Sequence, residues 1–407
     1  MSALAEPAAL HFDDALAKRN ALVLAVCQAL AGGNNTVVVA TGAILGGILA
    51  PNAGFATLPI TFMVLGMWIG TLPLGYLARR IGRRNALQVG SAFGVLSGFV
   101  SCGAAIIMSF PLLLLGTFFA GLYAAAHQSY RFAAADTASE AFRPKAVSWV
   151  LAGGVFAAII GPQLVIATKD MLPYLFAASY LGQSACALIA AGVLSFVKIP
   201  QVTHKHVEPA RPLKEIALTL RFTVAATCGV VSFAMMNILM TSAPLAMVTC
   251  GHSVTDATLG IQWHVMAMYA PSFITGSLIA RYGVERITAI GLGLLVLTAI
   301  VGISGTTVAH FWTNLILLGL GWNFAFIGAT TMVTHCHRPQ ERTTVQAFND
   351  FLIFGSMAIS SFSSGQLLAY FGWATVNEVI FPFVAVAGGL LLWLALRDRA
   401  QKAHSAS

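Results

Sequence analysis

Charged residues are scarce in this chain. Of its 407 residues, 9% are Asp, Glu, Lys or Arg and 58% are hydrophobic, and the mean hydropathy is +0.82. Soluble domains carry about 25% charged residues, so a soluble protein of this length would lack the polar surface that it needs. The deficit excludes a water-soluble domain and indicates that lipid is the solvent for most of the surface.

The patterns that hold metals or drive chemistry are also missing. The six cysteines stand singly, mostly inside apolar runs, which predicts neither a disulfide framework nor a metal site. The sequence has no Gly-x-x-x-x-Gly-Lys-Ser/Thr loop for ATP and no His-x-x-x-His or Asp-x-x-Asp pair. We therefore predict a protein that is not an enzyme and binds no cofactor or metal.

Long apolar runs are abundant, and they predict helices. A closed barrel needs apolar and polar residues in alternation, whereas these runs are nearly continuous and approach or exceed the roughly 20 residues that cross a bilayer. The lipid interior leaves only helices or barrels, so helices are favoured. Twelve spans are expected, at residues 20–49, 54–78, 86–108, 112–135, 146–168, 172–197, 218–248, 255–280, 287–307, 311–335, 344–370 and 374–396.

The basic residues orient these spans. If both termini are cytoplasmic, all of the 22 Lys and Arg except Lys169 and Arg131 lie in cytoplasmic loops, in the termini or at the adjoining helix ends. This asymmetry follows the positive-inside rule, and it accounts for the net charge of +8 without a nucleic-acid partner. We expect a multi-pass protein of the bacterial inner membrane with both termini in the cytoplasm.

The sequence repeats itself weakly across its middle. At an offset of about 203 residues, Leu112–Gly116 aligns with Leu315–Gly319, Asn34 with Asn237, and Gln163 with Gln366. Two similar halves are common in secondary transporters. We expect the following domains: a cytoplasmic lead-in 1–19, a six-helix bundle 20–197, a cytoplasmic linker 198–217, a second six-helix bundle 218–396 and a cytoplasmic tail 397–407.

The loop after the second expected span carries the most specific pattern. It reads Gly-Tyr-Leu-Ala-Arg-Arg-Ile-Gly-Arg-Arg over residues 75–84, and a degenerate copy begins at Gly276. This loop resembles the signature Gly-x-x-x-Asp-Arg-x-Gly-Arg-Arg of the major facilitator superfamily. The resemblance implies an all-α membrane protein of twelve transmembrane helices in two pseudo-symmetric six-helix bundles, of the drug or metabolite permease kind.

Arg79 stands where the family has an acidic residue that helps to latch the two halves together. The resemblance implies a latch or gating role for a set of residues that includes three acidic candidates for the missing charge: Gly75, Arg80, Gly82, Arg83, Arg84, Asp136, Glu140 and Asp350. The alternative is that residues 79–84 only anchor the loop at the membrane surface.

Two further family features are incomplete. Gly153, Gly154, Gly161 and Pro162 resemble part of a glycine-proline motif of antiporters, but Ala157 replaces one glycine. Close helix packing explains the same small residues. Thr117 stands near the place of an arginine found in proton-coupled drug antiporters. The direction and coupling of transport therefore stay open.

Polar and aromatic residues inside the spans are candidates for substrate binding, because polar groups in membrane helices usually face the bundle interior. In the family fold, spans 1, 4, 7 and 10 line the cavity, and spans 5 and 11 flank it. The candidates are Asn34, Asn35, His127, Tyr130, Arg131, Gln163, Asn237, Thr241, Trp322, Asn323, Phe326 and Gln366. For each, contacts between helices are the alternative role. Arg131 either attracts an electron-rich substrate or pairs with Asp136.

Two residues are candidates for a proton site. His264 lies inside span 8, and a histidine side chain ordinarily titrates near neutral pH, although a lone histidine more often makes a structural hydrogen bond. Asp350 lies early in span 11, near Asn349 and Gln346. Of its two possible roles, we expect the latch role rather than proton transfer.

We predict a secondary active transporter that moves a small organic solute, a metabolite or a drug, by rocking between its two halves, with protons as a possible coupling ion. The aromatic and amide residues favour a neutral or mildly anionic aromatic solute. A uniporter without ion coupling is the alternative, and a non-transporting receptor or scaffold is a third reading. The expected partners are the substrate, protons and the bilayer, and the protein is expected to be a monomer.

Overall fold

The structure, a computed structural model, describes residues 14–136, 138–139, 142–199, 211–338 and 341–406. Within these ranges all regular secondary structure is helical. The first half contains α1 (Asp14–Leu49), the 3-10 helix η1 (Ala53–Phe55), α2 (Leu58–Ile81), α3 (Arg83–Ile106), α4 (Phe110–Gln128), α5 (Tyr130–Asp136), α6 (Arg143–Thr168) and α7 (Ala177–Leu194). The second half contains α8 (Leu213–Ala217), α9 (Leu220–Thr249), α10 (Val254–Tyr269), α11 (Ser272–Tyr282), α12 (Val284–Ser304), α13 (Val308–Thr334), α14 (Arg342–Glu378) and α15 (Ile380–Ala406).

Twelve membrane spans emerge from these helices, as expected. Ten stretches of the described chain are long and apolar enough to cross a membrane, and the last of them, Thr344–Asp398, holds two spans that turn back at Gly372. The remaining span is α10 with α11, which are separated by a break at Ala270-Pro271. The break was not expected, because the sequence over 255–280 predicts one continuous helix.

Parts of the predicted lead-in, linker and tail are helical in the structure. Asp14–Arg19 form the start of α1, and α15 continues through the expected tail to Ala406. Residues 1–13, and residues 200–210 of the linker, lie outside the described chain, while Leu213–Ala217 of the linker form α8.

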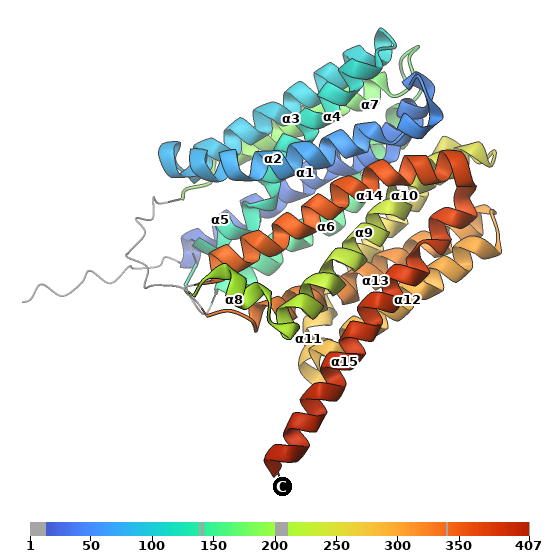
Figure 1. The fold of residues 1–407 in the computed structure, drawn as a ribbon. Helices are drawn as coiled ribbons and strands as arrows, with labels where there is room; N and C mark the ends of the chain where they lie inside the picture. The colour runs from blue at the N-terminus through green and yellow to red at the C-terminus, as the bar shows by residue number, and fades with distance from the viewer. Residues whose placement is uncertain (1–13, 137, 140–141, 200–210, 339–340, 407) are drawn as a thin grey trace, which may run out of the picture.

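Each half packs mainly within itself. In the first half α1 packs on α6, α2 and α3 pack on α4, and α3 packs on α7. In the second half α12 packs on α13, and α9 packs on α13 and α14. Figure 1 shows the two groups of helices side by side. Contacts between the halves follow the repeat, because α6 meets α10 and α2 meets α14.

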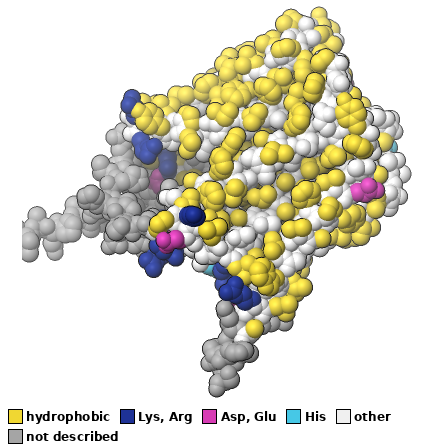
Figure 2. Space-filling view, viewed as in Figure 1, with side chains coloured by type: hydrophobic (Ala, Val, Ile, Leu, Met, Phe, Trp, Pro, Cys, Tyr) yellow, Lys and Arg dark blue, Asp and Glu magenta, His cyan; other side chains and the backbone are white. Residues whose placement is uncertain are grey.

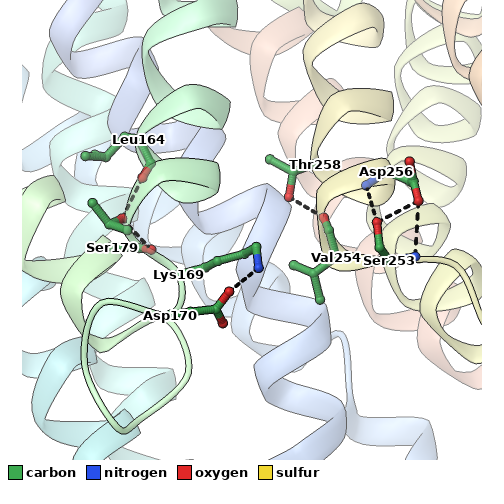
Figure 3. A network of polar contacts seen from close by, with 9 residues as sticks. Leu164, Lys169, Asp170, Ser179, Ser253, Val254, Asp256 and Thr258 are labelled. Carbon is green, nitrogen blue, oxygen red and sulfur yellow. Dashed lines mark hydrogen bonds and ion pairs between the residues drawn. The ribbon is translucent and has the colours of Figure 1, made fainter.

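The two ends of the bundle differ. We call the end where α1 begins, and where Lys198 and Arg211 flank the linker, the linker end, and the opposite end the far end. Hydrophobic side chains cover most of the face shown in Figure 2, whereas Lys and Arg gather beside the undescribed segments at the linker end. At the far end, Lys169 forms an ion pair with the neighbouring Asp170 (Figure 3).

Two glycines repeat the same unusual backbone. Gly82 (φ 85°, ψ 150°) separates α2 from α3, and Gly283 (φ 91°, ψ 149°) separates α11 from α12. A side chain is disfavoured at such positive φ values. These residues occupy matching places in the signature loop and its copy, so the loop and its copy share a local conformation as well as a sequence.

An ion pair fastens the end of the linker to the second half. Arg211 donates hydrogen bonds from Nε and Nη2 to the carboxylate of Glu341, at 2.6 and 2.7 Å, and the amide of Arg338 donates to it at 2.8 Å. The guanidinium of Arg211 and this amide hold the pKa of Glu341 down at about 2, and the pKa of Arg211 is raised. Glu341 is therefore ionised at neutral pH, and α8 is held against the start of α14.

Candidate functional site

A group of aromatic rings packs inside the second half. The indole of Trp322 stacks on Phe326, with ring centroids 5.0 Å apart and planes 14° apart. Phe233 of α9 meets both rings edge-on, at 5.4 and 5.0 Å. The indole nitrogen of Trp322 is buried without a hydrogen-bond partner in the described chain. A flat ring with polar edges could stack here and accept the indole hydrogen bond.

Asn34 is a buried amide with no bonds. Its side chain is 3% exposed, and neither its oxygen nor its nitrogen has a partner among the described residues. Val38, one turn further along α1, belongs to the hydrophobic cluster that joins the first half to α9. Residues four apart share a helix face, so Asn34 lies on the side of α1 that faces the other half. A buried polar group without a partner costs free energy, and a ligand would satisfy it.

The repeat mate of Asn34 is partly used by the fold. The amide nitrogen of Asn237 donates to the carbonyl of Met357 and to the hydroxyl of Ser360, both at 3.0 Å. These bonds fasten α9 to α14. The amide oxygen of Asn237 and the hydroxyl of Thr241 remain buried without partners, as does the oxygen of the partly buried Asn35.

Asn323 holds the break in the eighth span. Its amide nitrogen donates to the carbonyl of Met268 at 2.6 Å and to Ser272 at 2.7 Å, and its oxygen accepts from Thr275 at 2.6 Å. One backbone carbonyl and two hydroxyl groups beside the break are thereby bonded across to α13. Asn323, a predicted substrate ligand, is thus occupied by a structural task.

His264 also makes a structural bond. It is fully buried, and its Nδ1 lies 2.8 Å from the carbonyl oxygen of Leu315, which connects α10 to α13. His127 and Tyr130 are buried as well, and the ring of His127 lies beside those of Tyr123 and Tyr130 within the first half. Both nitrogens of His127 lack partners in the described chain.

Arg131 does not pair with Asp136, whose carboxylate bonds to Arg83 instead. The charge of Arg131 acts on that of Asp350 in α14 and on Tyr269 in α10, although Arg131 and Asp350 make no direct ion pair. The guanidinium also lies 4.8 Å from the ring of Phe132. Asp350 is exposed although it lies about 12 Å inside α14, at 1.5 Å per residue. The side chain of Asp350 is therefore not packed inside the bundle at this level.

The neighbouring residues belong to a contact between the halves. Ala124 and Ala125 of α4 and Met357 and Ala358 of α14 are members of one hydrophobic cluster, in which α2 packs against both helices. Asp350 precedes Met357 by seven residues, which is two helical turns on the same face. The charged residues thus continue this contact toward the linker end.

Gln163 and Gln366 lie at the far end of the interface between the halves. The amide nitrogen of Gln163 donates to Gln262 of α10 at 2.8 Å, and that of Gln366 donates to the carbonyl of Gly54 in η1 at 2.9 Å. Both bonds join the two halves. Ser361 adds to the second contact, because Thr57 donates to its carbonyl at 3.1 Å and Thr61 to its hydroxyl at 3.2 Å.

We call these contacts the far-end clasp: Gln163, Gln262, Gln366, Gly54, Thr57, Thr61 and Ser361. Sequence reasoning did not identify Gln262 or Ser361. The repeat offset of about 203 pointed to the two predicted glutamines, but the partner of each lies on a helix of the other half that no spacing rule connects to it. Within the described residues, every hydrogen bond between the halves lies in this clasp or beside it, between Tyr370 and Asn52.

The signature loop is bonded within its own half. Arg83 forms an ion pair with Asp136 at the end of α5, which is one of the three acidic residues that the sequence offered for the missing charge. The guanidinium of Arg80 lies 4.6 Å from the ring of Tyr76, and Arg84 is exposed. A Cβ at Gly75 would meet no atom within 4 Å. Glu140 lies outside the described residues.

The glycines of the sixth helix pack against α1. A Cβ at Gly153 would lie 2.3 Å from the carbonyl oxygen of Ala25, and one at Gly161 would lie 2.5 Å from that of Gly33. Such distances cannot be accommodated without a shift of the backbone. Close packing of α6 on α1 therefore requires these two glycines.

Comparisons with known proteins agree with this architecture. The sequence model of the Major Facilitator Superfamily matches residues 24–361 and 225–407. The chain belongs to the major facilitator superfamily. It is 46% identical over 379 residues to the riboflavin transporter RfnT of Brucella anthropi, which covers 92% of this chain and 95% of the relative.

Other members of the superfamily are more distant. The uncharacterised transporter YdeG of Bacillus subtilis is 31% identical over 373 residues, covering 87% of this chain and 86% of that one. Among solved structures, a variant of the nucleoside transporter NupG aligns with a TM-score of 0.70 at 14% identity, over 93% of this chain and 99% of that chain. A bacterial homologue of the human lysosomal transporter Spinster, inward-facing and unoccupied, aligns with a TM-score of 0.67 at 13% identity, over 93% and 97%. Both structures share the fold, and the superfamily assignment makes this chain a membrane transporter of a small solute.

Proposed function

We propose that this transporter moves a flat heteroaromatic metabolite of the riboflavin class across the bacterial inner membrane by alternating access. The observation that carries the proposal is the 46% identity to a riboflavin transporter along nearly the whole of both chains. The interior supplies suitable chemistry. Trp322 and Phe326 offer a stacking surface for fused rings, and Asn34 offers a free donor and acceptor for ring carbonyls, ring nitrogens or a hydroxylated side chain.

The linker end is assigned to the cytoplasm, because Lys and Arg gather there and cytoplasmic loops carry an excess of these residues. The clasp then closes the external end. The exposed carboxylate of Asp350, on the linker side of the bundle, indicates that the interior opens toward the cytoplasm. These features support an inward-facing conformation for the structure.

Arg131 and Asp350 are the proposed latch of the cytoplasmic end. They stand on opposite halves without touching in this conformation, and rocking the halves together at the linker end would bring them into contact. An ion pair between them would stabilise the outward-facing state that is absent here. Protonation of Asp350 would weaken that pair and thereby couple transport to protons. Facilitated transport without an ion is the alternative, in which Asp350 serves only as a latch.

Riboflavin uptake by purified protein in liposomes tests the function. Fluorescence should report accumulation of riboflavin inside the vesicles, and unlabelled riboflavin should compete. Trp322→Ala should weaken riboflavin binding by about five-fold to more than a hundred-fold, since stacking on one aromatic ring contributes about 1–3 kcal/mol.

Trp393→Ala is the matched control, because Trp393 lies on the lipid-facing surface and is 55% exposed. Absence of both binding and uptake of riboflavin by the wild-type protein would exclude this substrate. Binding without uptake would instead indicate a receptor.

A further inference from the structure

An apolar groove of about 530 Å³ opens on the surface of the first half, between α1 and α6. None of its ten lining residues carries a charged, hydroxyl or amide side chain. Several of them are large and exposed, including Leu22 at 57%, Val26 at 49% and Phe156 at 62%. In a membrane protein such a surface faces lipid.

The length of the groove matches one leaflet of a bilayer. Along α6 the lining runs from Trp149 to Ile160, which is about 16 Å at 1.5 Å per residue. Along α1 it runs from Leu22 to Leu30, which is about 12 Å. Half of the hydrocarbon core of a bilayer measures about 15 Å, so a single acyl chain fits along the groove.

On each of the two helices, a lysine lies one turn before the first groove-lining residue. Lys18 precedes Leu22 by four residues on α1, and Lys145 precedes Trp149 by four residues on α6, so each continues its groove face by one turn toward the linker end. The two helices run in the same direction, and Gly153 packs beside Ala25. That register places Lys18 and Lys145 at the same level.

These two lysines are exposed, and neither forms an ion pair in the part of the chain that the structure describes. The ammonium of Lys18 lies 5.8 Å from the ring of Phe142, and Arg19 is exposed beside it. Like charges at one level repel each other, and an anion between them would be stabilised by both. The combination of an apolar groove and cations at its membrane-surface end has the chemistry of a phospholipid site.

We propose that the groove between α1 and α6 binds an anionic phospholipid. One acyl chain lies along the groove, and the phosphate lies between Lys18 and Lys145. The site is separate from the substrate interior, since its lining residues face the membrane. The groove is formed by the two helices whose close contact depends on Gly153 and Gly161. A lipid bound to both helices would stabilise that contact and thereby the first half.

Lipid titration of delipidated protein, followed by native mass spectrometry, tests the charged end. Phosphatidylglycerol should bind more tightly than phosphatidylcholine, and Lys18→Gln with Lys145→Gln should weaken phosphatidylglycerol binding about thirty-fold, given the contribution of each basic residue near a membrane surface. The matched control is Lys214→Gln with Arg286→Gln, which removes two exposed charges from the second half. Equal weakening by both double variants would overturn the proposal in favour of a diffuse charge effect.

Ala152→Phe tests the groove itself, because it fills the space but keeps the lysines. It should weaken binding of a long-chain phosphatidylglycerol and leave binding of glycerol 3-phosphate unchanged. Val26→Trp at the exposed rim is the second variant, should Ala152→Phe fail to fold. If a variant with a filled groove folds and still binds the long-chain phosphatidylglycerol as the wild type does, the proposal is overturned. It is also overturned if the protein forms a dimer and substitutions in the groove make that dimer dissociate.

Discussion

At the scale of the residue, buried amides in this transporter divide into those that the fold uses and those that it leaves free. The side-chain amide of Asn323 donates to and accepts from residues beside the break in the eighth span, whereas the side chain of Asn34 has no hydrogen bond in the described chain. A buried polar atom without a partner costs free energy, so each one calls for an explanation, and binding of a ligand is one. The contrast separates stability from binding in a way that mutation can test.

Asn323→Ala should destabilise the protein, and Asn34→Ala should not. Loss of Asn323 removes its bonds to the carbonyl of Met268 and to Ser272 near the break, at about 1–3 kcal/mol for each buried group left without a partner. Asn34→Ala removes no hydrogen bond and should weaken riboflavin binding instead. Thermal unfolding in detergent and riboflavin titration distinguish the two effects. A fall in melting temperature for Asn34→Ala as large as that for Asn323→Ala would contradict this division.

A charge exchange tests the proposed latch. Arg131→Asp and Asp350→Arg should each lower riboflavin uptake about ten-fold or more, because each leaves two like charges opposed across the interior. The double variant should recover most of the uptake, since it restores opposite charges. Asp350→Asn should make uptake independent of an imposed pH gradient if this carboxyl group carries the proton. Failure of the double variant to improve on either single variant would exclude the pairing.

At the scale of the element, the repeat places equivalent helices in equivalent contacts. The pair α6 and α10 corresponds to the pair α14 and α2. At the far end the glutamine of α6 bonds to α10, and the glutamine of α14 bonds to η1, just before α2. The glutamines are repeat mates, but their partners differ, since one is a side chain and the other a backbone carbonyl. Symmetry therefore fixes where the halves touch and leaves the chemistry of each contact to vary.

Replacing both clasp glutamines by leucine should shift the protein toward the outward-facing state. Two hydrogen bonds of about 0.5–1.5 kcal/mol each would be lost, which changes the ratio of states by about five-fold to more than a hundred-fold. Spin labels at Ala53 and Phe371, in a background without native cysteines, should report longer distances. Gln346→Leu on α14, away from the clasp, is the control. Identical distance distributions in the variant and in the wild type would show that the clasp does not hold this end closed.

The tie between α8 and α14 should resist acid. Because the pKa of Glu341 in the folded protein is lowered to about 2 from its usual 4.5, its stabilising effect is complete above the usual value and is lost as the pH falls toward 2. Hydrogen exchange of Leu213–Ala217 should stay slow at pH 4. Glu341→Gln should accelerate it at neutral pH, whereas Glu215→Gln on α8 itself should change it little. Equal acceleration by both variants would assign the protection to another contact.

At the scale of the whole molecule, the sequence predicts the number of spans and the family well. Apolar run length, basic-residue placement and the repeat all follow from the physics of the bilayer, and that physics acts on each segment separately. The signature loop can also be predicted from local sequence. Its turn has a positive φ at residue 82, and a glycine stands at that position.

What the sequence could not predict depends on contacts between distant segments. Asp136 pairs with Arg83 rather than with Arg131, because the break after Gln128 and the packing of α5 decide the directions of these side chains. The structural bonds of Asn323 depend on distant segments in the same way. Its partners Met268, Ser272 and Thr275 flank the break at Pro271 in span 8, which lies far from Asn323 in the sequence.

The clasp is built from neutral amides, hydroxyls and backbone carbonyls, while the nearby charged groups of the far end, such as Lys169 with Asp170, pair within their own loops. Opening that end moves no net charge through the membrane field, so neither the transmembrane voltage nor the ionic strength should alter its rate. Dependence on voltage would then enter the transport cycle only where Arg131 and Asp350 move. Current measurements at different holding potentials would thus locate the electrogenic step in the opposite half of the membrane.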